Sequence, residues 1–227
     1  MALICASLAG ERPEDILKAA SGIEADLIEV RADRLTRCTR EEVHSLVSEL
    51  KKRASPGIIL TVRSSDEGGS FKGSEEERRD IILGSLHLAD MVDIELRAAI
   101  RDEIVEAARA NGVEVIVSYH DFERTPSKED ITALFEEEAG AGADYAKAAF
   151  MARSPGDVLE LLRAAEEASK RMRVVAISMG ELGRISRIAA PIFGSRIVYA
   201  AAGEATAPGQ LSLEDTAAIL EALGVRG

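Results

Sequence analysis

The sequence predicts a single (β/α)₈ barrel, and two observations support this prediction. Eight short apolar runs recur along the 227 residues, and longer amphipathic segments separate them. The runs are nearly continuous in hydrophobicity rather than alternating, as in parallel strands that are covered on both faces. A strand followed by a helix, repeated eight times, is the pattern of this barrel.

The strands and helices follow one another in strict order. The expected strands are residues 3–9, 25–32, 57–64, 91–96, 113–119, 144–150, 174–179 and 197–201. The expected helices are 12–21, 39–53, 74–89, 99–112, 127–141, 154–170, 180–193 and 212–223. Several helices carry start signals, which are Pro13 in a first turn and the capping pairs Thr39–Glu42, Ser74–Glu77 and Ser127–Asp130.

An open doubly wound sheet is the main alternative architecture. The first strand is not followed by a G-x-G-x-x-G turn, which weakens a dinucleotide-binding version of that fold. Because there is no linker or low-complexity tract, residues 1–227 are expected to form one catalytic domain.

Composition excludes several classes of function. The formal charge of −12 disfavours binding to nucleic acid, since phosphate backbones would be repelled. No apolar run approaches the ~20 residues of a membrane span, and the N-terminus lacks the basic start of a signal peptide, so a cytoplasmic protein is expected. Cys5 and Cys38 show no metal-type spacing, and His44 and His87 lie in helix-like segments, so no metal site is expected.

Polar residues gather at the carboxyl ends of the expected strands, where the active sites of such barrels lie. A barrel interior is usually filled by Val, Ile and Leu, so many ionisable groups on one rim need mutual pairing or a ligand. These residues are Ser7, Glu29, Arg31, Arg63, Glu67, Asp93, Glu95, His120, Asp121, Lys147, Ser178, Arg184, Arg187, Thr206 and Gln210, and the apolar Met179 ends the seventh strand beside Ser178.

Lys147 stands in the small and apolar run "YAKAAF". Burial lowers the pKa of an amine, and a neutral amine attacks carbonyl groups, so one interpretation is an imine-forming lysine. The alternative is a structural lysine that reaches solvent or pairs with a core carboxylate such as Glu95.

His120 is the one histidine placed at a strand end. A histidine near a nucleophilic lysine suits proton transfer, although a hydrogen-bonded rim histidine is equally compatible with the sequence. Arg31, Arg63 and Arg187 offer bidentate binding to an anion, or ion pairs with neighbouring glutamates.

Seven segments taken together resemble type I 3-dehydroquinate dehydratase. They run in order over nearly the whole chain, with one motif at almost every expected strand. The segments are "EVRAD" (29–33), "TVRSSDEGG" (61–69), "DIEL" (93–96), "SYHDF" (118–122), "AKAAF" (146–150), "SMGELGRISR" (178–187) and "APGQ" (207–210).

The resemblance implies a barrel, usually dimeric, that converts 3-dehydroquinate to 3-dehydroshikimate and water in the shikimate pathway, without metal or organic cofactor. It implies that Lys147 forms the imine, that His120 is the general acid and base, and that Glu67 orients the histidine. Arg187 would hold the substrate carboxylate. Substrate contacts are implied for Ser7, Glu29, Arg31, Arg63, Thr206 and Gln210. At Thr206 the chain departs from the family pattern, which commonly has serine there, so a hydroxyl is kept and a methyl is added.

Two other functions remain to be distinguished. An aldolase acting on a sugar phosphate would share Lys147, but it would need a phosphate cradle of glycine amides after the last two strands. A scaffold barrel that has lost catalysis would not need the lysine, histidine and glutamate together.

Overall fold

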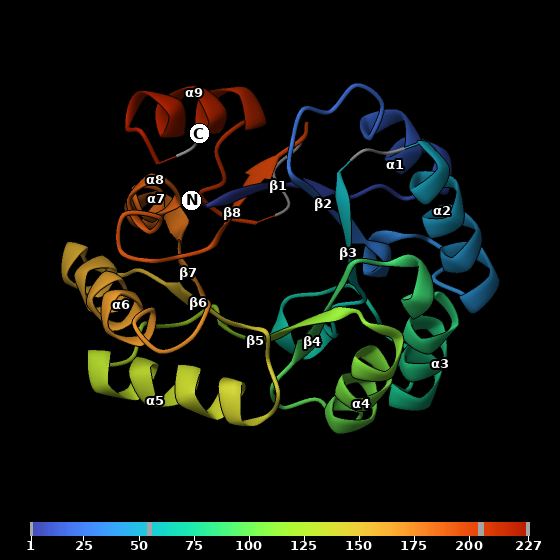
Figure 1. Cartoon of the computed structure of the whole chain (residues 1–227), viewed down its shortest axis with the longest axis horizontal. Coiled ribbons are helices and arrows are strands. Elements are labelled where there is room, and N and C mark those ends of the chain that lie inside the picture. The colour runs from blue at the N-terminus through green and yellow to red at the C-terminus, as the bar shows by residue number, and fades with distance from the viewer. Residues whose placement is uncertain (1, 54–55, 204–206, 226–227) are drawn as a thin grey trace.

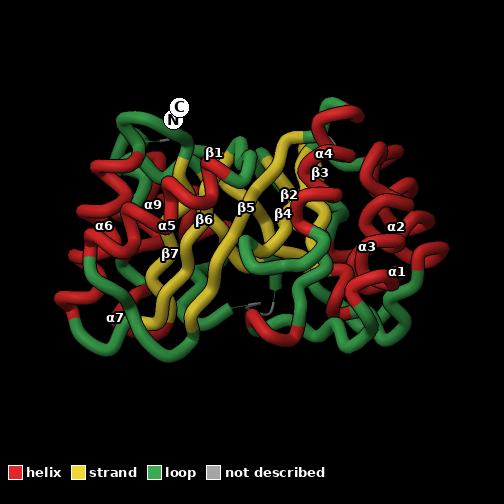
Figure 2. The backbone as a smooth tube through the Cα atoms, turned by 90° about the horizontal axis from the view of Figure 1, so that it is seen from below, coloured by secondary structure: helices red, strands yellow, loops and turns green. Residues whose placement is uncertain are grey.

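The computed structural model describes residues 2–53, 56–203 and 207–225. It confirms the barrel, in which eight parallel strands are neighbours in the order β7-β6-β5-β4-β3-β2-β1-β8 (Figures 1 and 2). The strands are β1 (Leu3–Leu8), β2 (Leu27–Arg31), β3 (Gly57–Thr61), β4 (Met91–Glu95), β5 (Glu114–Asp121), β6 (Tyr145–Met151), β7 (Val174–Met179) and β8 (Ile197–Ala201).

Helices form a ring outside the strands (Figure 1). They are α1 (Pro13–Ala19), α2 (Arg40–Arg53), α3 (Glu75–Ser85), α4 (Arg101–Asn111), α5 (Lys128–Gly140), α6 (Pro155–Ala168), α7 (Gly180–Gly183), α8 (Ser186–Ala189) and α9 (Leu213–Ala222). Three short 3-10 helices, η1 (Ala32–Arg34), η2 (Ser65–Glu67) and η3 (Leu86–Leu88), follow β2, β3 and α3. Among the described residues, none of the helices has the length and apolar character that crossing a membrane requires.

Two serine hydroxyls accept from main-chain amides of β7, which shares no regular ladder with β8. The amide of Ala176 donates to Ser195 Oγ at 3.1 Å, and the amide of Ser178 donates to Ser186 Oγ at 2.9 Å. The amide of Arg196 adds a main-chain bond to the Val174 carbonyl at 2.8 Å. These bonds satisfy strand amides that would otherwise be buried without a partner.

The capping predictions agree with the structure. Ser74 and Glu77 form the full reciprocal box at the start of α3, and the Ser127 hydroxyl accepts from the Asp130 amide. The Glu42 amide donates to the Thr39 hydroxyl at 3.3 Å. Each bond satisfies one of the free amides of a first helical turn.

Several predicted boundaries differ from the structure by a few residues, and two of the differences show their physical cause. The single helix expected over 180–193 is two short helices, because Gly183 packs against the Ser178 backbone and the Ser186 hydroxyl is bound to the same strand. The fifth strand was expected to end at residue 119, but β5 continues to Asp121 because His120 and Asp121 pair with Ala149 and Phe150 of β6.

The barrel interior is apolar at one level and charged at the next. Cys5, Leu27, Ile59, Met91 and Ile116 fill it with hydrophobic side chains. Closer to the carboxyl ends of the strands, Glu29, Asp93 and Lys147 are buried as well. The charged side chains therefore lie above a packed layer of apolar side chains in the barrel interior.

Glu138 on α5 is an unusual part of the outer core, because it is fully buried and, within the described residues, neither of its carboxyl oxygens makes a hydrogen bond of ordinary length and angle. Burial raises the pKa of Glu138 well above its usual range, and the main-chain amide of Lys147 offsets this only in part. A carboxyl whose folded pKa is raised binds its proton more tightly in the folded state. The protein therefore loses stability as the pH rises above the carboxyl's unfolded pKa.

We expect Glu138→Met to raise the melting temperature by several degrees, and by more at pH 8 than at pH 5. Replacing an unpaired buried ionisable group with an apolar one gains about 1–3 kcal/mol, which corresponds to ~2–4 °C per kcal/mol at this size. Thermal unfolding followed by circular dichroism measures the shift. Glu129→Met, at an exposed position of the same helix, is the control; equal effects of the two changes at both pH values would refute this interpretation of Glu138.

Candidate active site

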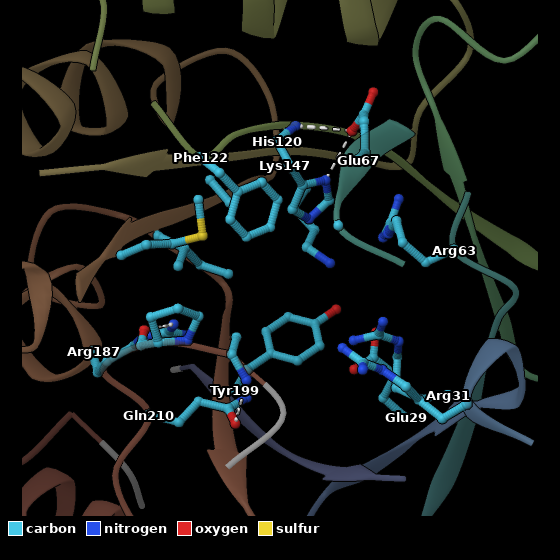
Figure 3. A pocket seen from close by; sticks show the side chains of 17 residues that line it. Glu29, Arg31, Arg63, Glu67, His120, Phe122, Lys147, Arg187, Tyr199 and Gln210 are labelled. Carbon is cyan, nitrogen blue, oxygen red and sulfur yellow. Dashed lines mark hydrogen bonds and ion pairs between the residues drawn. The ribbon is translucent and has the colours of Figure 1, made fainter. Parts of the chain in front are cut away.

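Eight of the ten predicted site residues line one cavity at the carboxyl ends of the strands (Figure 3). It encloses about 680 Å³, including its open mouth. Ser7 is buried and does not line the cavity, and its hydroxyl donates to the Glu29 carboxylate at 2.6 Å. Thr206 lies outside the described residues. The predicted residues that line the cavity are Glu29, Arg31, Arg63, Glu67, His120, Lys147, Arg187 and Gln210.

Lys147 projects inward from β6 and is only 4% exposed. Its Nζ lies 2.7 Å from Asp93 Oδ2 and 4.5 Å from the centre of the Tyr199 ring. The suggested pairing of this lysine with Glu95 was therefore wrong, because Asp93 is the carboxylate that reaches it. The amine is held between a negative charge and an aromatic face, both of which favour a cation at this point.

Asp93 connects three strands. Its Oδ1 accepts from Arg63 Nη2 at 2.8 Å and from the Ser118 hydroxyl at 2.6 Å. Burial alone would raise the pKa of Asp93, but the charges of Arg63 and Lys147 outweigh it and hold that pKa well below its usual range. Asp93 is thus a permanent negative charge under the site rather than a base.

His120 and Glu67 come from β5 and from η2, which follows β3. Glu67 Oε2 accepts from His120 Nδ1 at 3.0 Å and from the His120 amide at 2.9 Å. Burial and the positive charges of Arg63 and Lys147 lower the pKa of His120 well below 6.5, whereas burial raises the pKa of Glu67 to about 7. Above pH 7 the pair therefore consists of a neutral imidazole that donates from Nδ1 to a carboxylate. Its Nε2 is left as a base.

Gly68 fixes the position of Glu67. Its φ of 75° lies in the left-handed region, and a side chain there would come within 2.4 Å of the Phe122 ring. Phe122 follows β5 and lines the cavity beside His120 (Figure 3). Only glycine allows the loop after β3 to approach the end of β5 so closely.

The arginines differ in their partners. Arg31 makes two bonds of 2.8 Å to Asp33, and Arg63 contacts both Asp93 and Glu95. Arg187 is 4% exposed, and no carboxylate among the described residues pairs with it; its Nη2 reaches the Pro208 carbonyl at 3.4 Å. Burial lowers the pKa of Arg187 to about 10, so it remains charged at neutral pH. A buried guanidinium that no described carboxylate neutralises is able to form paired hydrogen bonds with an anion.

Sequence reasoning assigned no role to several residues of the site. Asp93 was recognised as a strand-end carboxylate, but its neighbours in sequence do not reveal that it contacts Lys147. Tyr199 and Phe122 are single aromatic residues whose positions become meaningful only in the barrel. Asp121, which was left out of the site, caps the following turn by accepting from the amides of Glu123 and Arg124.

Among the described residues, no group of three His, Cys, Asp or Glu side chains is arranged to hold a metal ion. Cys5 is buried, and Cys38 is partly buried with its pKa raised to about 12 by burial and neighbouring carboxylates.

A family model of type I 3-dehydroquinase matches residues 4–226. The chain belongs to this family. It is 40% identical over 220 residues to the 3-dehydroquinate dehydratase of Methanococcoides burtonii, covering 96% of this chain and 93% of the relative.

Solved structures of the family have the same fold. The 3-dehydroquinate dehydratase of Geobacillus kaustophilus is 33% identical with a TM-score of 0.94, covering 100% of this chain and 93% of that one. The type I enzyme of Clostridium difficile, solved with covalently modified comenic acid, is 33% identical with a TM-score of 0.92, covering 98% and 92%.

We expect His120 to stay neutral well below pH 6.5, because burial and the charges of Arg63 and Lys147 oppose a further positive charge, and to carry its proton on Nδ1 above pH 7, where Glu67 is a carboxylate. Nitrogen NMR of the histidine rings measures both the protonation and the tautomer. His44 and His87 are exposed on α2 and η3 and give reference signals in the same spectrum. A charged His120 ring at pH 7 would contradict this electrostatic account.

Proposed function

We propose that the chain dehydrates 3-dehydroquinate to 3-dehydroshikimate through an imine on Lys147. Membership of the type I 3-dehydroquinase family supports the reaction, a hydro-lyase step of the shikimate pathway. The observation that carries the covalent route is the buried Lys147 amine, which lines the same cavity as a neutral histidine and an arginine without a counter-charge.

The substrate is a ring that bears a carboxylate, a ketone and several hydroxyl groups. Arg187 binds the carboxylate, since its guanidinium is buried and can form two parallel bonds to a planar anion. Polar groups on the opposite side of the cavity bind the hydroxyl groups (Figure 3). These groups belong to Glu29, with Ser7 and Thr61 fixing its carboxylate, and to Arg31 and Arg63. Gln210, which lies on the same side of the cavity as Arg187, binds a further hydroxyl group (Figure 3).

The Lys147 ammonium passes a proton to His120 Nε2, and the free amine attacks the ketone to give a carbinolamine. His120 returns the proton to the carbinolamine hydroxyl, water leaves, and a protonated imine remains. Asp93 and the Tyr199 ring, which hold the ammonium before the reaction, then hold the iminium, which carries the same charge. The positive nitrogen withdraws electrons and acidifies the adjacent C–H bond.

His120 removes this proton with Nε2, and an enamine forms. Expulsion of the β-hydroxyl follows, with His120 returning its proton to the departing oxygen so that water leaves. Glu67 orients the ring through Nδ1 and stabilises the imidazolium between the two transfers. Water finally hydrolyses the product imine and restores the Lys147 amine.

The Clostridium difficile enzyme supports a covalent route, because its crystal structure holds a covalently modified organic acid. A homodimer and a cytoplasmic location remain predictions, the dimer resting on the family resemblance and the location on sequence features.

Sodium borohydride added during turnover should reduce the imine and leave a stable adduct on Lys147. Peptide mass mapping locates it, and the exposed Lys72 and Lys170 are internal controls. Lys147→Ala should form no adduct and lose turnover, measured as ultraviolet absorbance of the conjugated product, because the covalent path is gone.

An adduct on another lysine, or none in an active enzyme, would refute the imine route. A folded wild-type protein without turnover would instead favour a scaffold barrel. Adduct formation with a sugar phosphate but not with 3-dehydroquinate would favour an aldolase.

A further inference from the structure

Arg78 lies on α3, outside the barrel, yet its side chain is only 1% exposed. Its Nη1 donates to the Val62 carbonyl at 3.1 Å and to Glu95 Oε2 at 2.5 Å. On the outer side, Arg78 bonds to Glu75, whose side chain is 37% exposed. The guanidinium thus lies between the helix layer and the sheet. It links the partly exposed carboxylate of Glu75 to the buried carboxylate of Glu95 at the end of β4.

From Glu95 the contacts divide into two branches. Glu95 Oε1 accepts from the Ser64 amide at 2.8 Å, and Ser64 is the residue that begins the short helix η2, which carries Glu67. The same oxygen lies 3.3 Å from Arg63 Nη1. Arg63 in turn forms an ion pair with Asp93, and Asp93 forms an ion pair with Lys147.

Charges alternate along this path, with Arg78 positive, Glu95 negative, Arg63 positive, Asp93 negative and Lys147 positive. All five side chains are buried. Removing one member of a buried ion-pair chain leaves its neighbours uncompensated, so the members act as a unit.

We propose that Arg78 is a positioning residue for the reaction, acting through Glu95 on both Lys147 and Glu67. The inference rests on the proposed function, since it assigns Arg78 to the imine and proton-transfer groups. Arg78 contacts neither the cavity nor any reacting atom. It fixes the geometry and the electrostatic balance of residues that do.

Electrostatics distinguish this role from simple packing. The charged groups that face Glu67 are His120 from β5, Arg63 from the segment after β3, Asp93 and Glu95 from β4, Arg97 from the loop after β4, and Asp66 from η2 itself. A second cavity, outside the barrel, is lined by Glu67 together with Glu75, Arg78 and Glu95. The negative charge of Glu95 raises the pKa of Glu67, and Arg78 balances that charge.

The acid limb of the pH profile of kcat is the fall in kcat as the pH drops and Glu67 becomes protonated. Two substitutions should therefore move this limb in opposite directions. Arg78→Met removes the positive charge that pairs with Glu95, so the pKa of Glu67 rises further and the limb moves to higher pH. Glu95→Gln removes the charge while keeping the side-chain shape, so the limb moves to lower pH. Each shift should be roughly half a unit, below the 1–3 units of a direct ion-pair contact. In both variants kcat should fall about tenfold or more, with KM changed less.

Two further variants make the measurement interpretable. Glu67→Gln should abolish the limb near pH 7, and this loss would show that the limb reports the titration of Glu67. Arg79→Met is the matched control, because Arg79 lies next to Arg78 on α3 but pairs outward with Asp80 and Glu103, and it should leave the limb and kcat unchanged.

The outcomes separate this inference from the proposed function. An inactive wild-type protein would contradict the proposed function. An active wild type whose Arg78→Met and Glu95→Gln variants melt earlier but keep the wild-type limb and kcat would overturn the role of Arg78. If Arg78→Met does not fold, Glu95→Gln alone decides, since an unmoved limb there overturns the inference.

Discussion

The ion pair between Asp93 and Lys147 is the contact on which the rest of the site depends. A lysine that is 4% exposed inside a barrel would be strongly destabilising without a counter-charge, and Asp93 supplies one at 2.7 Å. Asp93 would itself be destabilising without Arg63 and Ser118, which occupy its other oxygen. The buried amine is therefore retained because a connected set of charges surrounds it.

The barrel brings these charged residues together at the carboxyl ends of its strands. Parallel strands in register place Thr61 beside Asp93, Glu95 beside Ser118, and Ser118 beside Lys147. Residues far apart in sequence thus become neighbours near the carboxyl ends of the strands. Hydrophobic side chains fill the barrel interior below these residues, so the charged groups pack against a dense apolar layer. The loops bring the remaining groups, with Glu67 carried to His120 by a turn that needs Gly68.

Much of the fold could be predicted from the sequence, because nearly continuous apolar runs and capping pairs are local signals. The segment 180–193 was misjudged because contacts of Gly183 and Ser186 with β7, invisible in the sequence, divide it. Strand-end polar residues and family motifs pointed to Lys147, His120 and Arg187. The pairing of Lys147 with Asp93 rather than Glu95 could not be predicted, since both carboxylates lie on β4 and differ only in height along the barrel. Arg78 was missed for a related reason, because it resembles any arginine of an amphipathic helix until the packing shows that it is buried.

The central role of Asp93 is tested most directly by Asp93→Asn, which keeps the shape of the side chain and removes its charge. Borohydride trapping with 3-dehydroquinate measures the iminium present during turnover, and circular dichroism confirms that the variant is folded. We predict that trapped adduct on Lys147 falls about tenfold or more, because a neutral amide at this position cannot balance the cation that lies against the Tyr199 ring. A folded variant that accumulates the wild-type amount of adduct at the wild-type rate would contradict this role of Asp93.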